Sequence, residues 1–324
     1  MSNKINLSNG VGYLAIPGPS VIPDRVLQAM HRPSPNIYAG ELVEMTHGIV
    51  PDLKKVARTR HHVAMYIGNG HAAWEASLAN TVFPGEKVLV PTTGSFGFGW
   101  AEMAKGIGAE VEIIDGGKQE PMDPGRVTEV LLADKAHEIK ALLVVHTDTS
   151  SSLRNDIPAM RQALDDAGHP ALLMVDCIAS LGCDAFEMDA WGVDVVLTGS
   201  QKGLMVPAGM SFVFFNEKAR AVRKAMPRVS CHWDWEPRAN PELYFQHFNG
   251  TAPTHHLYGL REALNMIGDE GIEQIWARHA RLARAIWAAV GVWGQEGPMR
   301  MNVQNPAHRS HAVTTLSLGA PNAT

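Results

Sequence analysis

The sequence predicts an α/β fold with a mostly parallel central sheet. Short apolar runs typical of buried strands alternate with helical stretches from residue 87 to residue 215, which is the order of βαβ units. Two of these runs end beside reactive side chains: the run 171–175 is followed by Asp176, and the run 193–197 by a turn that contains Lys202. Because the carboxyl ends of parallel strands meet at one edge of a sheet, where ligands bind, we expect this acid and this lysine to lie together.

The individual elements follow from the apolar runs and from the turn residues between them. Strands are expected at 87–91, 110–114, 141–146, 171–175, 193–197, 210–215 and, near the end of the chain, 312–318. Helices are expected at 22–30, from the turn at 67–70 to about residue 80, and at 100–107, 126–136, 156–167, 217–225, 257–269 and 271–292. Helices between consecutive strands imply right-handed crossovers, so neighbouring strands should run parallel. The segment 230–238 is rich in tryptophan and charge without periodicity, which is typical of an irregular surface or interface loop.

Composition limits the functions open to the chain. Its 324 residues are 45% hydrophobic and 19% charged, as in a folded soluble protein with room for two lobes. The net charge of −5 argues against nucleic acid or an anionic membrane as a partner. No apolar run reaches the roughly 18 residues of a membrane span, the first residues lack the apolar core of a secretory signal, and the cysteines form no disulfide framework. We therefore expect a cytoplasmic protein, and no metal site, since the histidines show no ligand spacing.

The pairing of a lysine with an acid is typical of one cofactor. Pyridoxal phosphate binds a lysine as a Schiff base and needs a carboxylate against its pyridine nitrogen. The glycine-rich turn at 67–70 opens a helix, and free amides at a helix N-terminus suit a phosphate group. Taken singly, Lys202 would be read as a surface lysine and Asp176 as a helix cap. Together, at the ends of two strands, they favour the cofactor.

Around these residues the chain resembles a known family. The stretches Val175–Gly182, Met188–Gly203 with its Ser-Gln-Lys-Gly run, and Pro207–Met210 resemble the class V aminotransferases, and most of all their serine–glyoxylate and alanine–glyoxylate branch. The likeness extends from Pro17 to about Leu318. It implies the pyridoxal-phosphate transferase fold type I, with a mostly parallel seven-stranded sheet in a large domain and a smaller α+β domain.

The resemblance also implies how the chain is divided and how it ends. Residues 21–270 would form the large cofactor-binding domain, and residues 1–20 and 271–324 part of the small domain. Family members continue for several dozen residues beyond this point. The arginine that pairs bidentately with the substrate carboxylate belongs to that part, and no residue of this chain matches its position.

Individual residues receive roles from the resemblance. Lys202 and Asp176 would be catalytic, the lysine moving a proton and the acid facing the pyridine nitrogen. The other expected cofactor contacts are Asn69, Gly70 and His71 at the phosphate, Phe96 and Ile178 on the two ring faces, Ser150 and Gln201 at polar groups of the cofactor, and Thr251 from across a dimer interface. Pro17, Gly18 and Tyr38 are expected beside the substrate.

The chain departs from the branch at several positions. Tyr38 stands where an arginine is usual, Ser151–Leu153 replaces a Thr-Gly pair, and Phe248 replaces a tyrosine. The first of these changes leaves the choice of amino donor open. The second leaves open the conformation of the loop that contains Ser150, and the third removes a hydroxyl contact.

These parts predict a pyridoxal-phosphate-dependent aminotransferase with a ping-pong mechanism. The resemblance implies that it would move an amino group from a small amino acid, such as serine or alanine, to glyoxylate or pyruvate, and that it would work as a homodimer with shared active sites. Other class V reactions are alternatives, namely pyridoxamine–pyruvate transfer, a lyase, or cysteine desulfuration, for which no cysteine is suitably placed. A homologue that binds the cofactor without turnover is a further alternative. A nicotinamide site is disfavoured, because Gly68-Asn-Gly70 does not continue as Gly-x-Gly-x-x-Gly.

Overall fold

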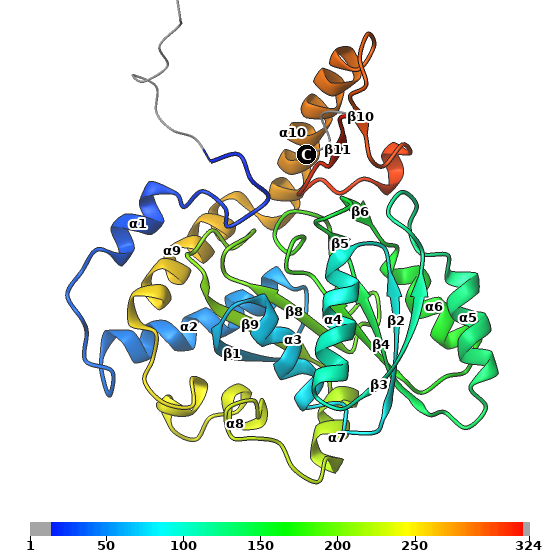
Figure 1. Ribbon diagram of the computed structural model, residues 1–324. Helices are drawn as coiled ribbons and strands as arrows, with labels where there is room; N and C mark the ends of the chain where they lie inside the picture. The colour runs from blue at the N-terminus through cyan, green and yellow to red at the C-terminus, as the bar shows by residue number, and fades with distance from the viewer. Residues whose placement is uncertain (1–13, 320–324) are drawn as a thin grey trace, which may run out of the picture.

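The computed structural model describes residues 14–319, and within them a seven-stranded sheet forms the centre of the molecule (Figure 1). Its strands are β1 (His62–Gly68), β2 (Lys87–Thr92), β3 (Glu110–Asp115), β4 (Ile139–Val145), β7 (Leu172–Asp176), β8 (Val195–Gly199) and β9 (Gly209–Phe215). They lie in the order β1-β9-β8-β7-β4-β2-β3. Only β9 is antiparallel to its neighbours among these strands, so the expected mostly parallel sheet is confirmed.

Ten α-helices accompany the sheet within the described residues. They are α1 (Asp24–Met30), α2 (Glu41–Val56), α3 (Gly70–Ala79), α4 (Ser95–Gly106), α5 (Pro124–Ala133), α6 (Ile157–Asp166), α7 (Glu217–Ala225), α8 (Glu236–Ala239), α9 (Thr254–Glu270) and α10 (Ile272–Trp293). The sequence did not predict β1, α2 or α8, and α4 begins at Ser95, where the prediction had residue 100. The remaining helices match their predicted positions to within a few residues.

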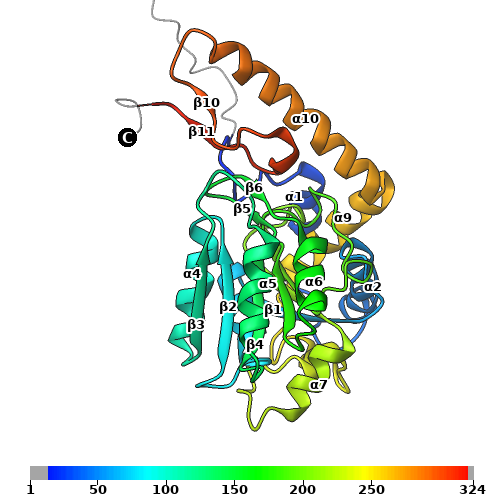
Figure 2. The same cartoon turned by 90° about the vertical axis from the view of Figure 1, so that its right-hand side faces the viewer.

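Helices cover both faces of the sheet, as Figures 1 and 2 show. Helices α3 and α4 pack on one face, and α2, α5 and α6 on the other. Side chains alternate between the faces along each strand, so in β7 Leu173 faces one core and Leu172 the other. Burial on both faces explains why the strands are apolar without a polar alternation.

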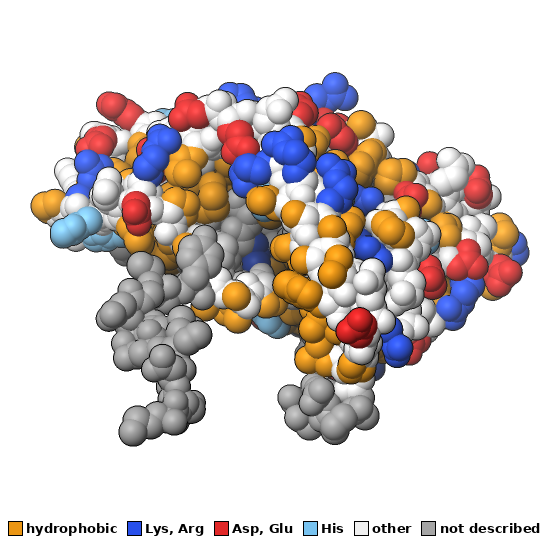
Figure 3. Space-filling model, turned by 90° about the horizontal axis from the view of Figure 1, so that it is seen from above, with side chains coloured by type: hydrophobic (Ala, Val, Ile, Leu, Met, Phe, Trp, Pro, Cys, Tyr) orange, Lys and Arg blue, Asp and Glu red, His pale blue; other side chains and the backbone are white. Residues whose placement is uncertain are grey.

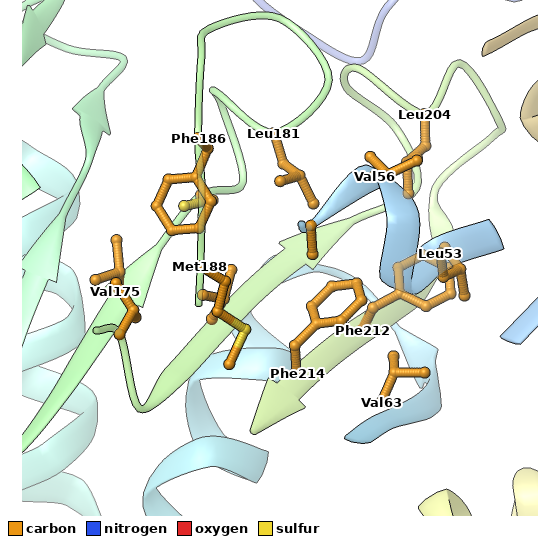
Figure 4. Packing of buried hydrophobic residues seen from close by; sticks show 14 of the residues in the cluster. Leu53, Val56, Val63, Val175, Leu181, Phe186, Met188, Leu204, Phe212 and Phe214 are labelled. Atoms are coloured by element: carbon orange, nitrogen blue, oxygen red, sulfur yellow. The ribbon is translucent and has the colours of Figure 1, made fainter. Parts of the chain in front are cut away.

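The core on the α2 face is built mainly from aromatic and branched side chains (Figure 4). Phe212 and Phe214 of β9 project toward Leu53 and Val56 of α2, and all four are at most 3% exposed. Burying a side chain of this size stabilises the fold by roughly 1.5–3 kcal/mol. This packing fixes β8 and β9, and with them the turn that carries Lys202.

The C-terminal part of the chain lies above the carboxyl edge of the sheet (Figure 2). Strands β10 (Arg300–Met301) and β11 (Leu316–Ser317) pair beside α10, so the strand expected at 312–318 is only two residues long. Asp184 ties this part to the core, because its buried carboxylate accepts hydrogen bonds from Ser310 Oγ at 2.6 Å and from the His311 amide at 3.0 Å. The division into domains stays a prediction, and residues 1–13 and 320–324 of the expected small domain lie outside the described residues.

Four short elements complete the fold. The hairpin β5 (Thr147–Asp148) and β6 (Leu153–Arg154) follows β4, and two 3-10 helices, η1 (Tyr244–His247) and η2 (Pro306–His308), flank the last two long helices. Between residues 14 and 319 no helix combines the length and apolarity needed to cross a membrane. In the same range no three His, Cys, Asp or Glu side chains are grouped to hold a metal ion.

The segment 230–238 is a surface loop only in part, which differs from its prediction. It was expected to be a surface or interface loop, but Trp235 and Arg238 are fully buried. The Trp235 ring stacks on Phe215 with 4.2 Å between centroids. The Arg238 guanidinium donates hydrogen bonds to the carbonyls of Met65 and His232. The missing periodicity reflects an irregular backbone that anchors side chains in the core.

Candidate active site

The expected acid and lysine meet at the carboxyl edge of the sheet. Asp176 is the last residue of β7 and pairs with Leu197 of the parallel strand β8, and Lys202 follows β8 by three residues (202 − 199 = 3). Asp176 is 3% exposed, and Lys202 is half-buried. The charge of Lys202 lowers the pKa of Asp176, and the charge of Asp176 raises the pKa of Lys202.

An N-terminal loop closes over Lys202. The Nζ atom of Lys202 donates a hydrogen bond to the carbonyl of Pro17 at 2.8 Å. Ser20 donates through its amide to Gln201 O and through its hydroxyl to Lys202 O. Gly18 has a φ of 152°, and a Cβ atom there would lie 2.2 Å from Lys202 Nζ. Only glycine allows the backbone to approach the amine this closely, so the loop places Pro17 and Gly18 beside Lys202, and their contact with the substrate stays a prediction.

Asp176 is held by one donor on each oxygen. Its Oδ1 accepts the amide of Ile178 at 2.7 Å, and its Oδ2 accepts the indole N–H of Trp74 at 2.7 Å. Burial raises the pKa of Asp176 to about 7, although both donors and the charge of Lys202 act to lower it. The carboxyl group is therefore balanced between its neutral and ionised forms near neutral pH.

The surroundings of Lys202 lower the pKa of its amine, which suits a general base. Burial lowers the pKa of Lys202, while the charge of Asp176 opposes this effect. A lower pKa increases the share of neutral amine near pH 7. Neutral amine is the form that attacks a carbonyl carbon or accepts a proton from carbon.

The N-terminus of α3 lies at the same edge. Asn69 precedes the helix, and its side-chain oxygen accepts the amides of His71 at 3.1 Å and Ala72 at 3.4 Å. No acidic residue occupies the first turn, so the positive end of the helix dipole is not neutralised there. A Cβ atom on Gly70 would lie 2.4 Å from Cδ1 of Ile178, which packs this turn tightly against the chain after β7.

Aromatic rings line the same region. Phe96 is the second residue of α4 and is partly buried, and its ring lies edge-on to Trp74 with 6.3 Å between centroids. The His71 ring also contacts Trp74 edge-on, at 4.6 Å. Trp74 therefore links the start of α3, the start of α4 and the carboxylate of Asp176.

Asp148 organises the start of α4. It is fully buried, and its Oδ2 accepts the amides of Phe96 at 2.9 Å and Gly97 at 3.2 Å. Its Oδ1 accepts the amide and the hydroxyl of Ser150, whose oxygen in turn accepts the amide of Ser95 at 2.8 Å. The hydroxyl of Ser150 is thus joined to the start of α4, and Asp148 fixes the position of Phe96.

Sequence reasoning missed both Trp74 and Asp148. Asp148 lies in a run of polar residues, 146–152. Such a run is typical of a loop exposed to solvent, but most residues of this run are buried. Trp74 lies within an apolar helix, where a tryptophan normally serves only as core. The available signal was chemical, because a buried indole N–H needs an acceptor and a buried carboxylate needs a donor.

Two predicted residues are not brought to Lys202 within this chain. The side chain of Tyr38 is 84% exposed, and Thr251 is exposed in the segment before α9. Neither lines the 760 Å³ cavity beside Lys202, which is bordered by Pro17, Cys183 and Arg278 among others. Seen from above, the molecule is hollowed near its centre, and hydrophobic side chains lie along the rim (Figure 3).

The residues present fit pyridoxal phosphate. Four groups lie at one edge of the sheet. They are a buried carboxylate, a half-buried lysine, a helix N-terminus without acidic residues and an aromatic ring. The Oε1 atom of Gln201, next to the lysine, is buried and has no hydrogen-bond partner within residues 14–319. Each group matches one part of the cofactor: pyridine nitrogen, aldehyde, phosphate and ring face.

The sequence of the chain is similar to those of proteins with known functions. A family model described as aminotransferase class-V matches residues 12–320. A serine–glyoxylate aminotransferase of Methylorubrum extorquens is 37% identical over 315 residues, which are 95% of this chain and 77% of that protein. An L-aspartate–glyoxylate aminotransferase of Paracoccus denitrificans is 38% identical over 283 residues, covering 86% of this chain and 70% of that protein.

Solved structures agree with the sequence relatives. The alanine–glyoxylate aminotransferase of Nostoc sp. superposes with a TM-score of 0.84 at 28% identity, over 98% of this chain and 85% of that one. The pyridoxamine–pyruvate aminotransferase of Mesorhizobium loti superposes with a TM-score of 0.85 at 26% identity, over 94% and 76%. The chain belongs to the class V aminotransferases, the pyridoxal-phosphate-dependent transaminases of fold type I.

Proposed function

We propose that the enzyme transfers the amino group of a small amino acid, such as serine or alanine, to glyoxylate, with pyruvate as a second acceptor. Sequence relatives named serine–glyoxylate and L-aspartate–glyoxylate aminotransferase support glyoxylate as the acceptor. The relatives differ in their named donor, serine in one and L-aspartate in the other, so the donor is left to the experiment below. The observation that carries the proposal is the position of Lys202 and Asp176 at the ends of neighbouring strands.

Each proposed contact has a geometric basis. Lys202 would hold the aldehyde of the cofactor, Asp176 its ring nitrogen, and the α3 N-terminus with Asn69, Gly70 and His71 its phosphate. Phe96 and Ile178 would lie on the two faces of the ring, and Ser150 and Gln201 would bind its polar groups. The Oε1 atom of Gln201 is buried and has no partner in the part of the chain that the structure describes, which supports its assignment. The tight packing of Ile178 on Gly70 supports a shared pocket.

When bound, the cofactor supplies a protonated pyridine ring that withdraws electrons from the carbon beside the substrate nitrogen. Asp176 would hold the proton of the ring nitrogen with its negative charge. The Nζ atom of Lys202 would accept the α-proton of the amino acid, and its lowered pKa keeps a fraction of the amine neutral for this role. The loop of Pro17 and Gly18 orients Nζ through the hydrogen bond to Pro17 O.

We also propose a homodimer in which Thr251 reaches the phosphate bound by the partner, and Tyr38 the substrate. The high exposure of both side chains in a single chain supports a contact that a second copy would complete. A closed two-fold dimer is the commonest arrangement for such shared sites. A cytoplasmic location is supported by the three cysteines, all of which are free thiols.

Product analysis tests the proposed reaction. The protein loaded with pyridoxal phosphate is incubated with serine, alanine or aspartate together with glyoxylate or pyruvate, and the new amino acid is measured by chromatography. We expect glycine to form from glyoxylate with at least one small donor, and Lys202→Ala to lower the rate by about a thousandfold or more. Formation of no glycine or alanine from any pair, or full turnover in the Lys202→Ala variant, would refute the proposal.

A further inference from the structure

Trp74 occupies a central position in the site. It is 1% exposed on α3, and its indole N–H donates to Oδ2 of Asp176 at 2.7 Å. Its ring is stacked on Trp100, with 6.2 Å between centroids and 12° between planes. The rings of His71 and Phe96 contact it edge-on. Three residues expected to hold the cofactor, His71, Phe96 and Asp176, therefore share this one neighbour.

The surroundings leave Trp74 little freedom to turn. A Cβ atom on Gly99 of α4 would lie 3.3 Å from Cζ3 of Trp74, so helix α4 packs closely on the ring. An indole has a single donor, and here its only hydrogen is directed at Asp176. Because the amide of Ile178 holds the other oxygen, the carboxylate cannot rotate without breaking a hydrogen bond.

We propose that Trp74 is a positioning residue for the cofactor: its indole N–H favours the ionised form of the Asp176 carboxyl group and orients it toward the pyridine nitrogen. The role rests on the proposed function, in which Asp176 faces that nitrogen. Trp74 itself acts through Asp176 and through the packing of His71 and Phe96.

The electrostatic balance at Asp176 supports this role. Burial and the charge of Asp148 on β5 raise its pKa, whereas the Ile178 amide, the Trp74 indole and the charge of Lys202 lower it. The neighbouring thiol of Cys177 is itself buried, with its pKa raised, and stays neutral. Loss of the indole donor moves the pKa of Asp176 upward, so a larger fraction of the carboxyl group is protonated at neutral pH and fails to hold a pyridinium N–H.

A matched pair of variants separates this role from simple packing. Trp74→Phe removes the donor and keeps an aromatic ring. Trp100→Phe changes the other member of the same stack, whose Nε1 is buried with no partner among the described residues. Equilibrium dialysis measures the dissociation constant for pyridoxal phosphate from about pH 6 to about pH 9, a range that brackets the titration of Asp176.

We expect Trp74→Phe to bind pyridoxal phosphate about tenfold more weakly near neutral pH, equivalent to about 1.4 kcal/mol. The pH below which binding weakens should move upward by about one unit, while Trp100→Phe keeps the wild-type profile. A cofactor analogue with carbon in place of the ring nitrogen should bind wild type and Trp74→Phe within about twofold of each other, because it offers nothing for Asp176 to hold.

The alternatives give different results. Equal weakening of the natural cofactor and of the carbon analogue in Trp74→Phe, or identical pH profiles for the two variants, would overturn the proposed role and leave Trp74 as packing only. Wild-type protein that binds no pyridoxal phosphate at any pH would overturn the proposed function itself, and this inference with it.

Discussion

At the residue scale, the Asp176 carboxyl group is subject to opposing effects. Its burial favours the neutral form, and the donors on its two oxygens favour the charged form. The ionised form of a buried carboxyl group lowers the stability of the cofactor-free protein, and it becomes favourable only when a cation binds beside it. Functional sites commonly carry such perturbed groups.

Asp176→Asn should remove a loss of stability that the cofactor-free wild-type protein shows as pH rises. The folded-state pKa of about 7 lies above the ordinary value of 3.8 for an aspartate carboxyl group, so the native state binds the proton more tightly and wild-type stability falls as pH rises from about 4 to about 7. The asparagine variant lacks this decline, so we expect its free energy of unfolding, measured by urea titration, to rise relative to that of wild type between about pH 4 and about pH 8.

The difference between the two proteins near pH 4 is the internal control, because it contains the pH-independent effect of an amide placed opposite the Ile178 and Trp74 donors. Cofactor affinity should be lower in the asparagine variant, because the amide carries no charge to hold a pyridinium. A wild-type protein whose stability did not fall relative to the variant between about pH 4 and about pH 8 would contradict the balance described for Asp176.

At the element scale, the start of α4 depends on a residue from another element. Asp148 of β5 supplies the carboxylate that accepts the first amides of α4, since Gly94 at the N-cap position has no side chain to do so. A Cβ atom on Gly94 would lie 2.3 Å from Cγ of Asp148. The glycine thus makes room for the buried acid, and the acid positions Phe96.

Asp148→Ala should weaken both the fold and the binding of the cofactor. Loss of a helix cap costs about 1 kcal/mol, and the buried amides left without an acceptor add to that cost. Asp123→Ala is the matched control, because Asp123 caps α5 through the Gly125 amide away from the site. We expect both variants to melt at lower temperature, and only Asp148→Ala to bind pyridoxal phosphate more weakly; equal affinities would contradict the positioning of Phe96 by Asp148.

Much of the sheet and the two central site residues could be predicted from the sequence, because apolar runs and the residues that end them are local signals. Helix α2 was missed, since Pro51 lies inside it and proline normally interrupts a helix. Trp74 and Asp148 were missed because their partners are 102 and 52 residues away along the chain. Contacts at such separation depend on the fold and leave no pattern in the local sequence.

At the scale of the whole molecule, we propose that each active site combines two copies of the chain. Lys202 and Asp176 lie at the edge of the sheet, whereas Thr251 is exposed before α9 and does not line the cavity beside Lys202. If Thr251 serves the partner's phosphate, each active site combines residues from both protomers.

Complementation between two inactive variants tests the shared site. Lys202→Ala lacks the amine, and Thr251→Asp places a negative charge against the phosphate. In a mixed dimer one site joins the intact lysine of one chain to the intact threonine of the other, so random mixing should restore about a quarter of wild-type activity. Two copies of the same variant provide the control. No recovery after the subunits have exchanged would contradict a site shared through Thr251.

The central claim is a covalent link between the cofactor and Lys202. Reduction of the protein loaded with pyridoxal phosphate by sodium borohydride makes that link permanent, and peptide mapping by mass spectrometry locates it. The account predicts the reduced cofactor on the ε-nitrogen of Lys202, and its absence from Lys218, whose amine donates to Ala171 O and Asp194 Oδ2 before the start of β7 and β8. An unmodified Lys202, or cofactor attached elsewhere in the chain, would contradict it.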